Sequence, residues 1–359
     1  MKNRVFGLDL FRTIAVVIVM LTHSQYDLND LIPFHFPIKF PHGSDLFLIL
    51  SGYLIGRSIM KVYKSEPNTT DFEFTKKYLY KRWIRTLPNY FLFLFINIVL
   101  IYFGLIAGFL NKYLITYFVF FQNFIKPYDF LYWESWTLAV SEWFYFIFPI
   151  VTFVFFKLFS RFSSKSIFLF IIGLFIVLPI IYRINIDESL DWDLFVRKIV
   201  LARLDAIGYG LLAAFIHLYY QEFWFKFKNL FFCTGLLIMF LVLNFNINDV
   251  VYMNVCYLSI LGISICFLLP KFESIKKASP KLNWVYFISK ISYSIYWVHM
   301  PLNQILKGFL TFESVTGMLF YLLLYSTLTI MISYFIYSFF ERKIMEKLGE
   351  GLKQNPKRF

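Results

Sequence analysis

Long apolar runs alternate with short polar segments along almost the whole chain. Most runs approach the length of about 20 residues that a helix needs to cross the hydrocarbon core of a bilayer. The runs cover residues 6–23, 44–60, 89–109, 137–156, 167–182, 199–219, 229–245, 250–269, 286–306 and 315–340. Segment 112–125 is too short to span and is expected to be interfacial or re-entrant. The pattern therefore predicts about ten transmembrane helices.

Lysine and arginine are concentrated in every second connecting segment. The rich segments are the N-terminus, 57–85, 157–165, 226–228, 271–281 and the chain after 342. Under the positive-inside rule, these segments and both termini are cytoplasmic. The largest predicted loop, 61–88, contains a basic amphipathic stretch at 77–85. That stretch either anchors to lipid head groups or binds an anionic, phosphate-bearing ligand.

Composition agrees with a membrane protein. Of the 359 residues, 59% are hydrophobic and 16% are charged, whereas soluble domains are less apolar and more charged. The net charge of +13 follows from the cytoplasmic loops, and no nucleic-acid partner is expected. We predict an all-α polytopic membrane protein with one domain over residues 1–345 and a short basic cytoplasmic tail at 346–359.

The N-terminal run resembles a signal peptide only in part. Asp9 and Arg12 interrupt the apolar run, and no small-residue cleavage site follows, so we expect a retained first helix. The cysteines at 233, 256 and 266 lie in apolar runs and are predicted to be buried small hydrophobic residues. The five histidines lack ligand spacing, and no metal is expected.

The first helix carries ionisable groups at unusual depth. Arg12 and His23 are eleven residues apart, which places them on nearly the same helix face, about 16 Å apart along the axis. Such groups are costly in a membrane and usually line a site. A simpler interpretation remains open, in which Asp9 pairs with Arg12 and His23 lies at the interface.

Four further predicted helices carry polar clusters, at 42–52, 134–145, 203–210 and 292–301. Small residues in such clusters also pack helices, and single charges also pair across a bundle. Polar groups on five helices together predict an internal polar cavity. In such a cavity, a histidine with a pKa near neutrality is the natural general base.

Seven motifs follow one another along the chain in a characteristic order. They are Gly7-Leu-Asp9-x-x-Arg12-x10-His23, the segment Gly43–Ile55, Arg82-x-x-Arg85-x-x-Pro88-x-Tyr90, Trp136–Tyr145, Arg203-x-Asp205, Ile291–Pro301 and Phe340-Glu341-Arg342. This order resembles the acyltransferase 3 family, integral membrane enzymes that O-acylate cell-surface glycans. The resemblance extends from residue 7 to about 343, and it corresponds to the standalone form without an added extracellular domain.

The resemblance implies roles for particular residues. His23 would be the catalytic base, and Arg12, Arg82 and Arg85 would receive the phosphates of an acyl-CoA, expected to be acetyl-CoA, from the cytoplasm. Further catalytic candidates are Glu142 and Asp45, and further pocket candidates are Asp9, Ser51, Tyr145, Arg203, Asp205 and His299. The expected acceptor is a lipid-linked or extracytoplasmic glycan, and the expected location is a bacterial inner membrane.

Two departures and two alternatives accompany the resemblance. Ser141 stands where the family has glutamate, which leaves open whether Glu142 takes over, and Lys343 stands where proline is common. A polysaccharide or lipid-linked glycan transporter is the main alternative. A membrane glycosyltransferase has only the Asp191-Trp-Asp193 pair in its favour, and the charge pattern places that pair outside.

Overall fold

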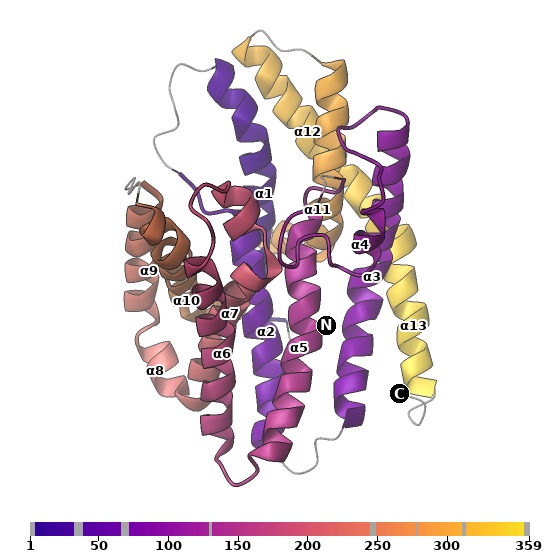
Figure 1. The fold of residues 1–359 in the computed structure, drawn as a ribbon. Helices are drawn as coiled ribbons and strands as arrows, with labels where there is room; N and C mark the ends of the chain where they lie inside the picture. Colours follow the sequence, from indigo (N-terminus) through magenta and orange to yellow (C-terminus); the bar gives the residue numbers. More distant parts are fainter. Residues whose placement is uncertain are drawn as a thin grey trace.

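The computed structural model describes residues 4–31, 39–65, 72–128, 131–244, 249–277, 279–310 and 314–354. Within these ranges the chain forms helices and loops (Figure 1). The elements are α1 (Phe6–Leu31), α2 (Gly43–Ser65), α3 (Phe72–Tyr102), α4 (Leu114–Phe118), α5 (Ser135–Leu158), α6 (Ser164–Ile184), η1 (Asp193–Arg197), α7 (Val200–Tyr219), α8 (Gln221–Lys226), α9 (Lys228–Asn244), η2 (Tyr252–Tyr257), α10 (Leu258–Ser274), η3 (Pro280–Leu282), α11 (Asn283–Phe309), α12 (Val315–Ile336), η4 (Tyr337–Glu341) and α13 (Arg342–Gln354). Elements η1, η2 and η4 are π-helical, and η3 is a 3₁₀ turn.

Each predicted apolar run coincides with helix. Among the described residues, eight helices are long and apolar enough to cross a membrane. The other two predicted runs correspond to α9, which has 17 residues, and to α11, which has 27. Helix α9 is at the lower limit of length for a span. Helix α11 is long enough, but its polar residues lower its hydropathy. The all-α polytopic membrane fold is confirmed.

Two sequence predictions need correction. The segment predicted as a loop before residue 89 is helical from Phe72, because Pro88 lies inside α3 without ending it, and α3 stops at Tyr102 rather than 109. Cys233 and Cys256 are exposed on the bundle surface, and only Cys266 is half-buried. Apolar sequence does not distinguish a lipid-facing side chain from a core side chain, because both surroundings are apolar.

Helices α2 and α7 cross at the centre of the bundle. A Cβ on Gly52 would lie 2.2 Å from the carbonyl oxygen of Ile207, and a Cβ on Gly210 would lie 2.2 Å from that of Ile49. Only glycine allows the two backbones to approach this closely, as is common where membrane helices meet. The crossing anchors the helices that carry Asp45, Ser51 and Arg203.

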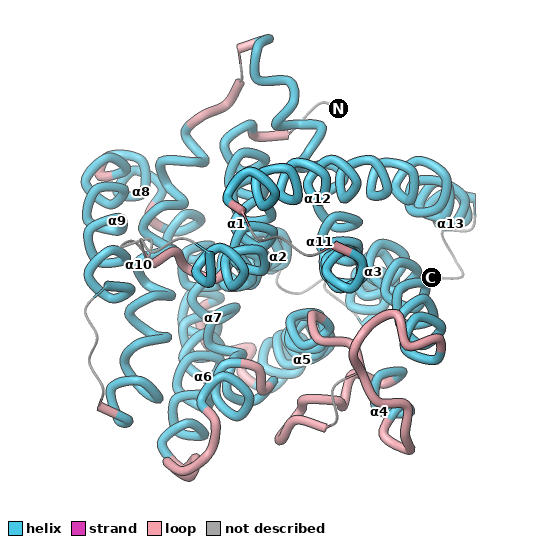
Figure 2. The backbone as a smooth tube through the Cα atoms, turned by 90° about the horizontal axis from the view of Figure 1, so that it is seen from above, coloured by secondary structure: helices cyan, strands magenta, loops and turns pink. Residues whose placement is uncertain are grey.

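The helices are arranged around a polar interior. Viewed from above, α2, α3, α5 and α11 surround the middle of the bundle (Figure 2). The end of α2, the start of α3 and the turn from α5 to α6 lie at the same, lower end in Figure 1. The helix ends that flank two of the segments assigned to the cytoplasm therefore share one end of the molecule. Large apolar residues such as Phe95, Leu158 and Leu323 are exposed on the outer surface, as a lipid-facing surface requires.

Candidate functional site

One cavity brings together the three arginines singled out from the sequence. It encloses about 150 Å³ between α1, α2, α3, α5 and α11. Its lining includes Arg12, Arg82, Arg85, Ser51 and Tyr145. We call this space the arginine cavity. Its volume is below the 300–1,000 Å³ of pockets that enclose a whole drug-sized ligand, so it accommodates one end of a larger ligand.

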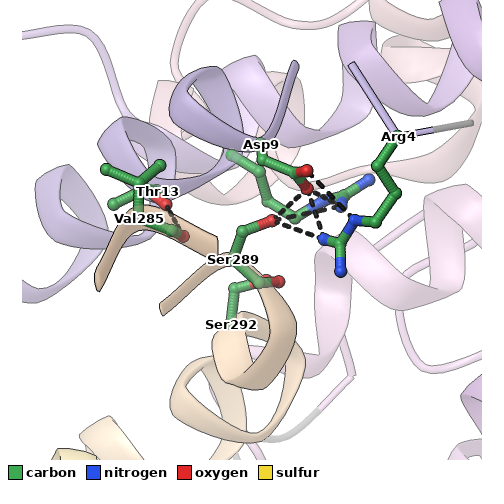
Figure 3. A network of polar contacts seen from close by, with 7 residues as sticks. Arg4, Asp9, Thr13, Val285, Ser289 and Ser292 are labelled. Carbon is green, nitrogen blue, oxygen red and sulfur yellow. Dashed lines mark hydrogen bonds and ion pairs between the residues drawn. The ribbon is translucent and has the colours of Figure 1, made fainter. Parts of the chain in front are cut away.

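A polar network joins Asp9 on α1 to Ser289 on α11 (Figure 3). The same network holds Arg12 in place. Its Nη1 lies 3.5 Å from Asp9 Oδ1 and donates to Ser289 Oγ at 3.4 Å. Ser289 Oγ in turn donates to Asp9 Oδ1 at 2.7 Å, and Arg4 forms a further ion pair with Asp9. The expected pairing of Asp9 with Arg12 therefore occurs, and Arg12 still lines the cavity. Asp9 is 3% exposed and acts as a positioning group between two cations.

Arg82 and Arg85 occupy the same wall on α3. Arg82 Nη2 donates to Tyr145 Oη at 2.8 Å, and its guanidinium lies 4.3 Å from the centre of that ring. Arg85 is exposed, and it forms no ion pair or hydrogen bond within the described ranges. Lys290 also lines the cavity. The cavity wall thus has more cationic than anionic side chains, which favours an anionic ligand.

Ser141 occupies the position where the family motif has glutamate, and Glu142 follows it in the chain. Ser141 lines the arginine cavity, whereas Glu142 is not among its lining residues. Glu142 is buried, and neither carboxylate oxygen has a hydrogen-bond partner in the described part of the chain. Its carboxylate is within electrostatic range of Arg82. Ser141 thus faces the arginine cavity, whereas Glu142 lies beside Arg82.

His23 and His299 form a pair at the far end of α1 from Arg12. Their ring centroids are 5.2 Å apart, with 50° between the ring planes. His299 Nδ1 lies 2.7 Å from the carbonyl oxygen of Tyr296, an acceptor that assigns the proton to Nδ1. His299 Nε2 has no hydrogen-bond partner among the described residues. The pair therefore presents a free imidazole lone pair inside the bundle.

Asp45 and Asp205 each pair with an arginine. Asp45 forms a buried ion pair with Arg203, and Asp205 Oδ2 lies 2.6 Å from Nη1 of Arg183. Neither pair lines the arginine cavity. The Arg183–Asp205 pair is fully buried and joins α6 to α7. Sequence reasoning did not single out Arg183 as the partner of Asp205.

Helix α11 contributes polar groups that were not among the individual site residues expected from the sequence. Ser289, Lys290, Tyr293 and Tyr296 line the arginine cavity. A signal was present, because Ser289, Ser292, Tyr296, His299 and Asn303 recur every three or four residues. This spacing places them on one helix face.

Titratable residues outside the spanning helices lie within electrostatic range of His23. His23 is within electrostatic range of His42, Arg197 and Lys198. Burial lowers the pKa of His42 to about 4. Burial alone would raise the pKa of Asp193, but its ion pairs with Arg197 and Lys198 outweigh this and bring the pKa to about 2. The acidic pair at 191–193 thus contributes an ion-paired carboxylate at this end.

A comparison with protein families gives one match. A family model described as an acyltransferase domain matches residues 5–338. The matched range contains the arginine cavity and the histidine pair. No curated protein and no solved structure matches the chain.

Proposed function

Because the chain belongs to the acyltransferase 3 family, it is a membrane acyltransferase, and we propose that it moves an acetyl group from acetyl-CoA to a glycan hydroxyl. The proposed acceptor is a cell-surface or lipid-linked glycan, and the proposed location is a bacterial inner membrane. The convergence of Arg12, Arg82 and Arg85 on one cavity carries this proposal.

The arginine cavity suits the phosphate-bearing part of the donor. Arginine binds phosphate oxygens through paired, charge-assisted hydrogen bonds. Arg85 is exposed and Arg82 is half-buried, so this end is accessible to a soluble donor. The cavity holds only part of a molecule as large as acetyl-CoA, and we infer that the rest extends along the bundle.

The histidine pair suits the reacting end. Arg12 and His23 lie about 16 Å apart along α1, a separation that an extended coenzyme arm can bridge. In the proposed step, His23 takes the proton of the acceptor hydroxyl while the hydroxyl oxygen attacks the thioester carbonyl carbon. The carbon–sulfur bond breaks, an ester forms, and the released coenzyme thiolate is protonated to the thiol. His299, whose Nε2 is free, would orient His23 or share its proton.

Asp45 and Glu142 have supporting positions in this proposal. Asp45 pairs with Arg203, and Glu142 is buried beside Arg82 rather than on the cavity wall. We therefore assign both to positioning of nearby arginines. Asp205 stabilises the fold through Arg183.

The experiment that tests the proposal measures donor binding and turnover in purified protein. Wild type should bind acetyl-CoA in calorimetry and transfer a radiolabelled acetyl group to an envelope glycan fraction. Arg85→Ala should weaken donor binding, whereas Lys81→Ala, which removes an exposed cation of the same helix, should not. Wild-type protein that neither binds nor consumes acetyl-CoA would refute the donor assignment and favour the transporter alternative.

A further inference from the structure

A second cavity lies at the end of the bundle that the charge pattern assigns to the outside. It has a volume of about 410 Å³, and it lies between the α6–α7 and α9–α10 connections. The residues that carry its chemistry are Asp187, Glu188, Trp192, Asp249, Tyr252, Asn254 and Tyr257. We call it the outer pocket. None of the site residues predicted from the sequence lines it.

Aromatic side chains form a fixed wall of the outer pocket. Trp192 and Tyr257 pack edge to face, with ring centroids 5.6 Å apart. The indole nitrogen of Trp192 donates to the carbonyl oxygen of Met253 at 3.3 Å. Tyr252 contributes a third ring. Rings held in this way offer rigid apolar faces with polar edges, which suit a ligand that is both apolar and hydroxylated.

Asn254 points to a polar ligand. It is 6% exposed and lines the pocket, yet its amide forms no hydrogen bond with the described residues. An amide carries two donors and an acceptor, and because Asn254 lines the pocket these groups are available to a ligand there. A hydroxylated ligand in the pocket would satisfy both kinds of group.

The backbone around the outer pocket departs from regular helix. Trp192 immediately precedes the π-helical segment η1, and η2 supplies Tyr252, Asn254 and Tyr257. Segments of π-helix are rare and occur frequently at functional sites, because the extra residue changes where side chains are presented. Two such segments border this one pocket.

Charge restricts the ligand further. Three carboxylates, of Asp187, Glu188 and Asp249, line the pocket, and Lys39 is the one cation among its described lining residues. Asp187 and Asp249 each use one oxygen to accept a backbone N–H of their own turn, at 2.9 and 2.6 Å. An anionic ligand would be repelled, whereas a neutral or amine-bearing one would not.

The outer pocket and the histidine pair share a charged residue within electrostatic range, Arg197. Tyr257 is within electrostatic range of Arg197, and so is His23. Tyr257 is also within range of the Asp45–Arg203 pair. Residues of the outer pocket and of the histidine pair are thus both within electrostatic range of Arg197.

We propose that the outer pocket binds a neutral or amine-bearing sugar unit of the acceptor, stacked on Trp192 and hydrogen-bonded by Asn254. This inference rests on the proposed function for the direction of transfer, but sugar binding itself is independent of it. The bound unit would hold the chain of the acceptor so that a neighbouring hydroxyl reaches His23.

The test measures sugar binding without any donor. Saturation-transfer NMR would compare methyl glucoside, methyl glucosaminide and methyl glucuronide with purified protein in detergent. Wild type should transfer saturation to the first two and little to the acidic sugar. Asn254→Ala should weaken binding about fivefold, as expected for the loss of a hydrogen bond. Trp192→Ala should weaken it at least as much, and Trp192→Phe should restore part of the signal.

Controls separate the possible outcomes. Trp284→Ala removes an exposed tryptophan at the start of α11 and should leave sugar binding unchanged. Absence of transfer with wild type, equal transfer in the variants, or a preference for glucuronide would overturn the outer-pocket proposal. Calorimetry with acetyl-CoA on the same samples tests the proposed function separately, so that a protein that binds the donor but no sugar, or sugar but no donor, identifies which proposal fails.

Discussion

The imidazole rings of His23 on α1 and His299 on α11 lie 5.2 Å apart, and the carbonyl of Tyr296 engages Nδ1 of His299. Imidazole both accepts and returns protons, so the structure brings the proposed base and a second proton acceptor together.

Loss of either histidine should therefore impair catalysis more than binding. We expect His23→Ala to lower kcat by at least about 100-fold, the usual contribution of a general base. His299→Gln should lower kcat to a smaller extent, because it removes the partner and leaves the base. The measurement is acetyl transfer by detergent-purified protein, alongside the affinity for acetyl-CoA.

A matched control for these variants lies one residue away. Among the residues that the structure describes, the hydroxyl of Thr22 donates only to carbonyl oxygens of its own helix, so Thr22→Ala should retain activity. Retention of wild-type kcat per folded molecule by His23→Ala would refute its role as the base.

Removal of the cavity arginines should weaken the binding of acetyl-CoA and leave the binding of the acceptor almost unchanged. Charge-assisted hydrogen bonds contribute about 1.5–3 kcal/mol, so Arg85→Ala should raise the KM for acetyl-CoA by about 10- to 100-fold. The KM for the acceptor should change little. The affinity of wild type for acetyl-CoA should decrease as the salt concentration rises, because salt screens the attraction between the arginines and the phosphates. Steady-state kinetics at two ionic strengths check both points, and an equal rise in both KM values would contradict the assignment.

The network around Asp9 predicts a graded response. Ser289→Ala removes one donor to Asp9 and one acceptor from Arg12, so we expect a loss of about 1 kcal/mol in stability and a few-fold rise in the KM for acetyl-CoA. Asp9→Asn should be more harmful, because it leaves Arg4 and Arg12 without their counter-charge. Thermal unfolding in detergent gives the comparison.

A second-site change tests the explanation for Asp9. Replacing Arg4 by methionine in the Asp9→Asn background removes one of the two cations left without a counter-ion and should restore part of the lost stability. A double variant that is less stable than Asp9→Asn alone would show that charge compensation is not the reason.

The buried ion pair between α6 and α7 predicts a large structural effect. Asp205→Asn should cost about 3–5 kcal/mol, because it leaves the fully buried Arg183 guanidinium without a counter-ion. Arg342→Ala breaks an exposed pair with Glu346 and should cost at most about 1 kcal/mol. Unfolding in mixed micelles with increasing SDS measures both. Similar losses in the two variants would argue against a structural role for Asp205.

Glu134 lies just before α5, and because its carboxyl group is buried we expect the stability of the protein to depend on pH. Burial raises its pKa from 4.5 to about 8, so the folded protein holds a proton there that the unfolded chain releases between these values. The free energy of unfolding should therefore contain a contribution that is complete below pH 4.5 and is lost as the pH rises towards 8. Glu134→Gln removes the titrating group and should flatten this slope.

The control for this pH effect is an exposed glutamate. Glu222→Gln should leave the dependence of the melting temperature on pH as in wild type. A wild-type slope in Glu134→Gln would place the origin of the pH dependence elsewhere.

The sequence by itself determined the helices and much of the arginine site. Hydrophobic runs located every long helix, because a helix in lipid must satisfy its own backbone and cover itself with apolar side chains. The eleven-residue spacing of Arg12 and His23 placed them on one face, since helical geometry is local. The motif order identified the family that the match over residues 5–338 then established.

Tertiary structure alone decided which polar groups meet. The apolar pattern does not specify how each helix is rotated, because lipid and protein interior are equally apolar. That rotation places Ser141 on the cavity wall and Glu142 off it, and it pairs Asp45 with Arg203. It also exposes Cys233. The outer pocket is formed by two segments more than forty residues apart along the chain, so no local pattern could indicate it.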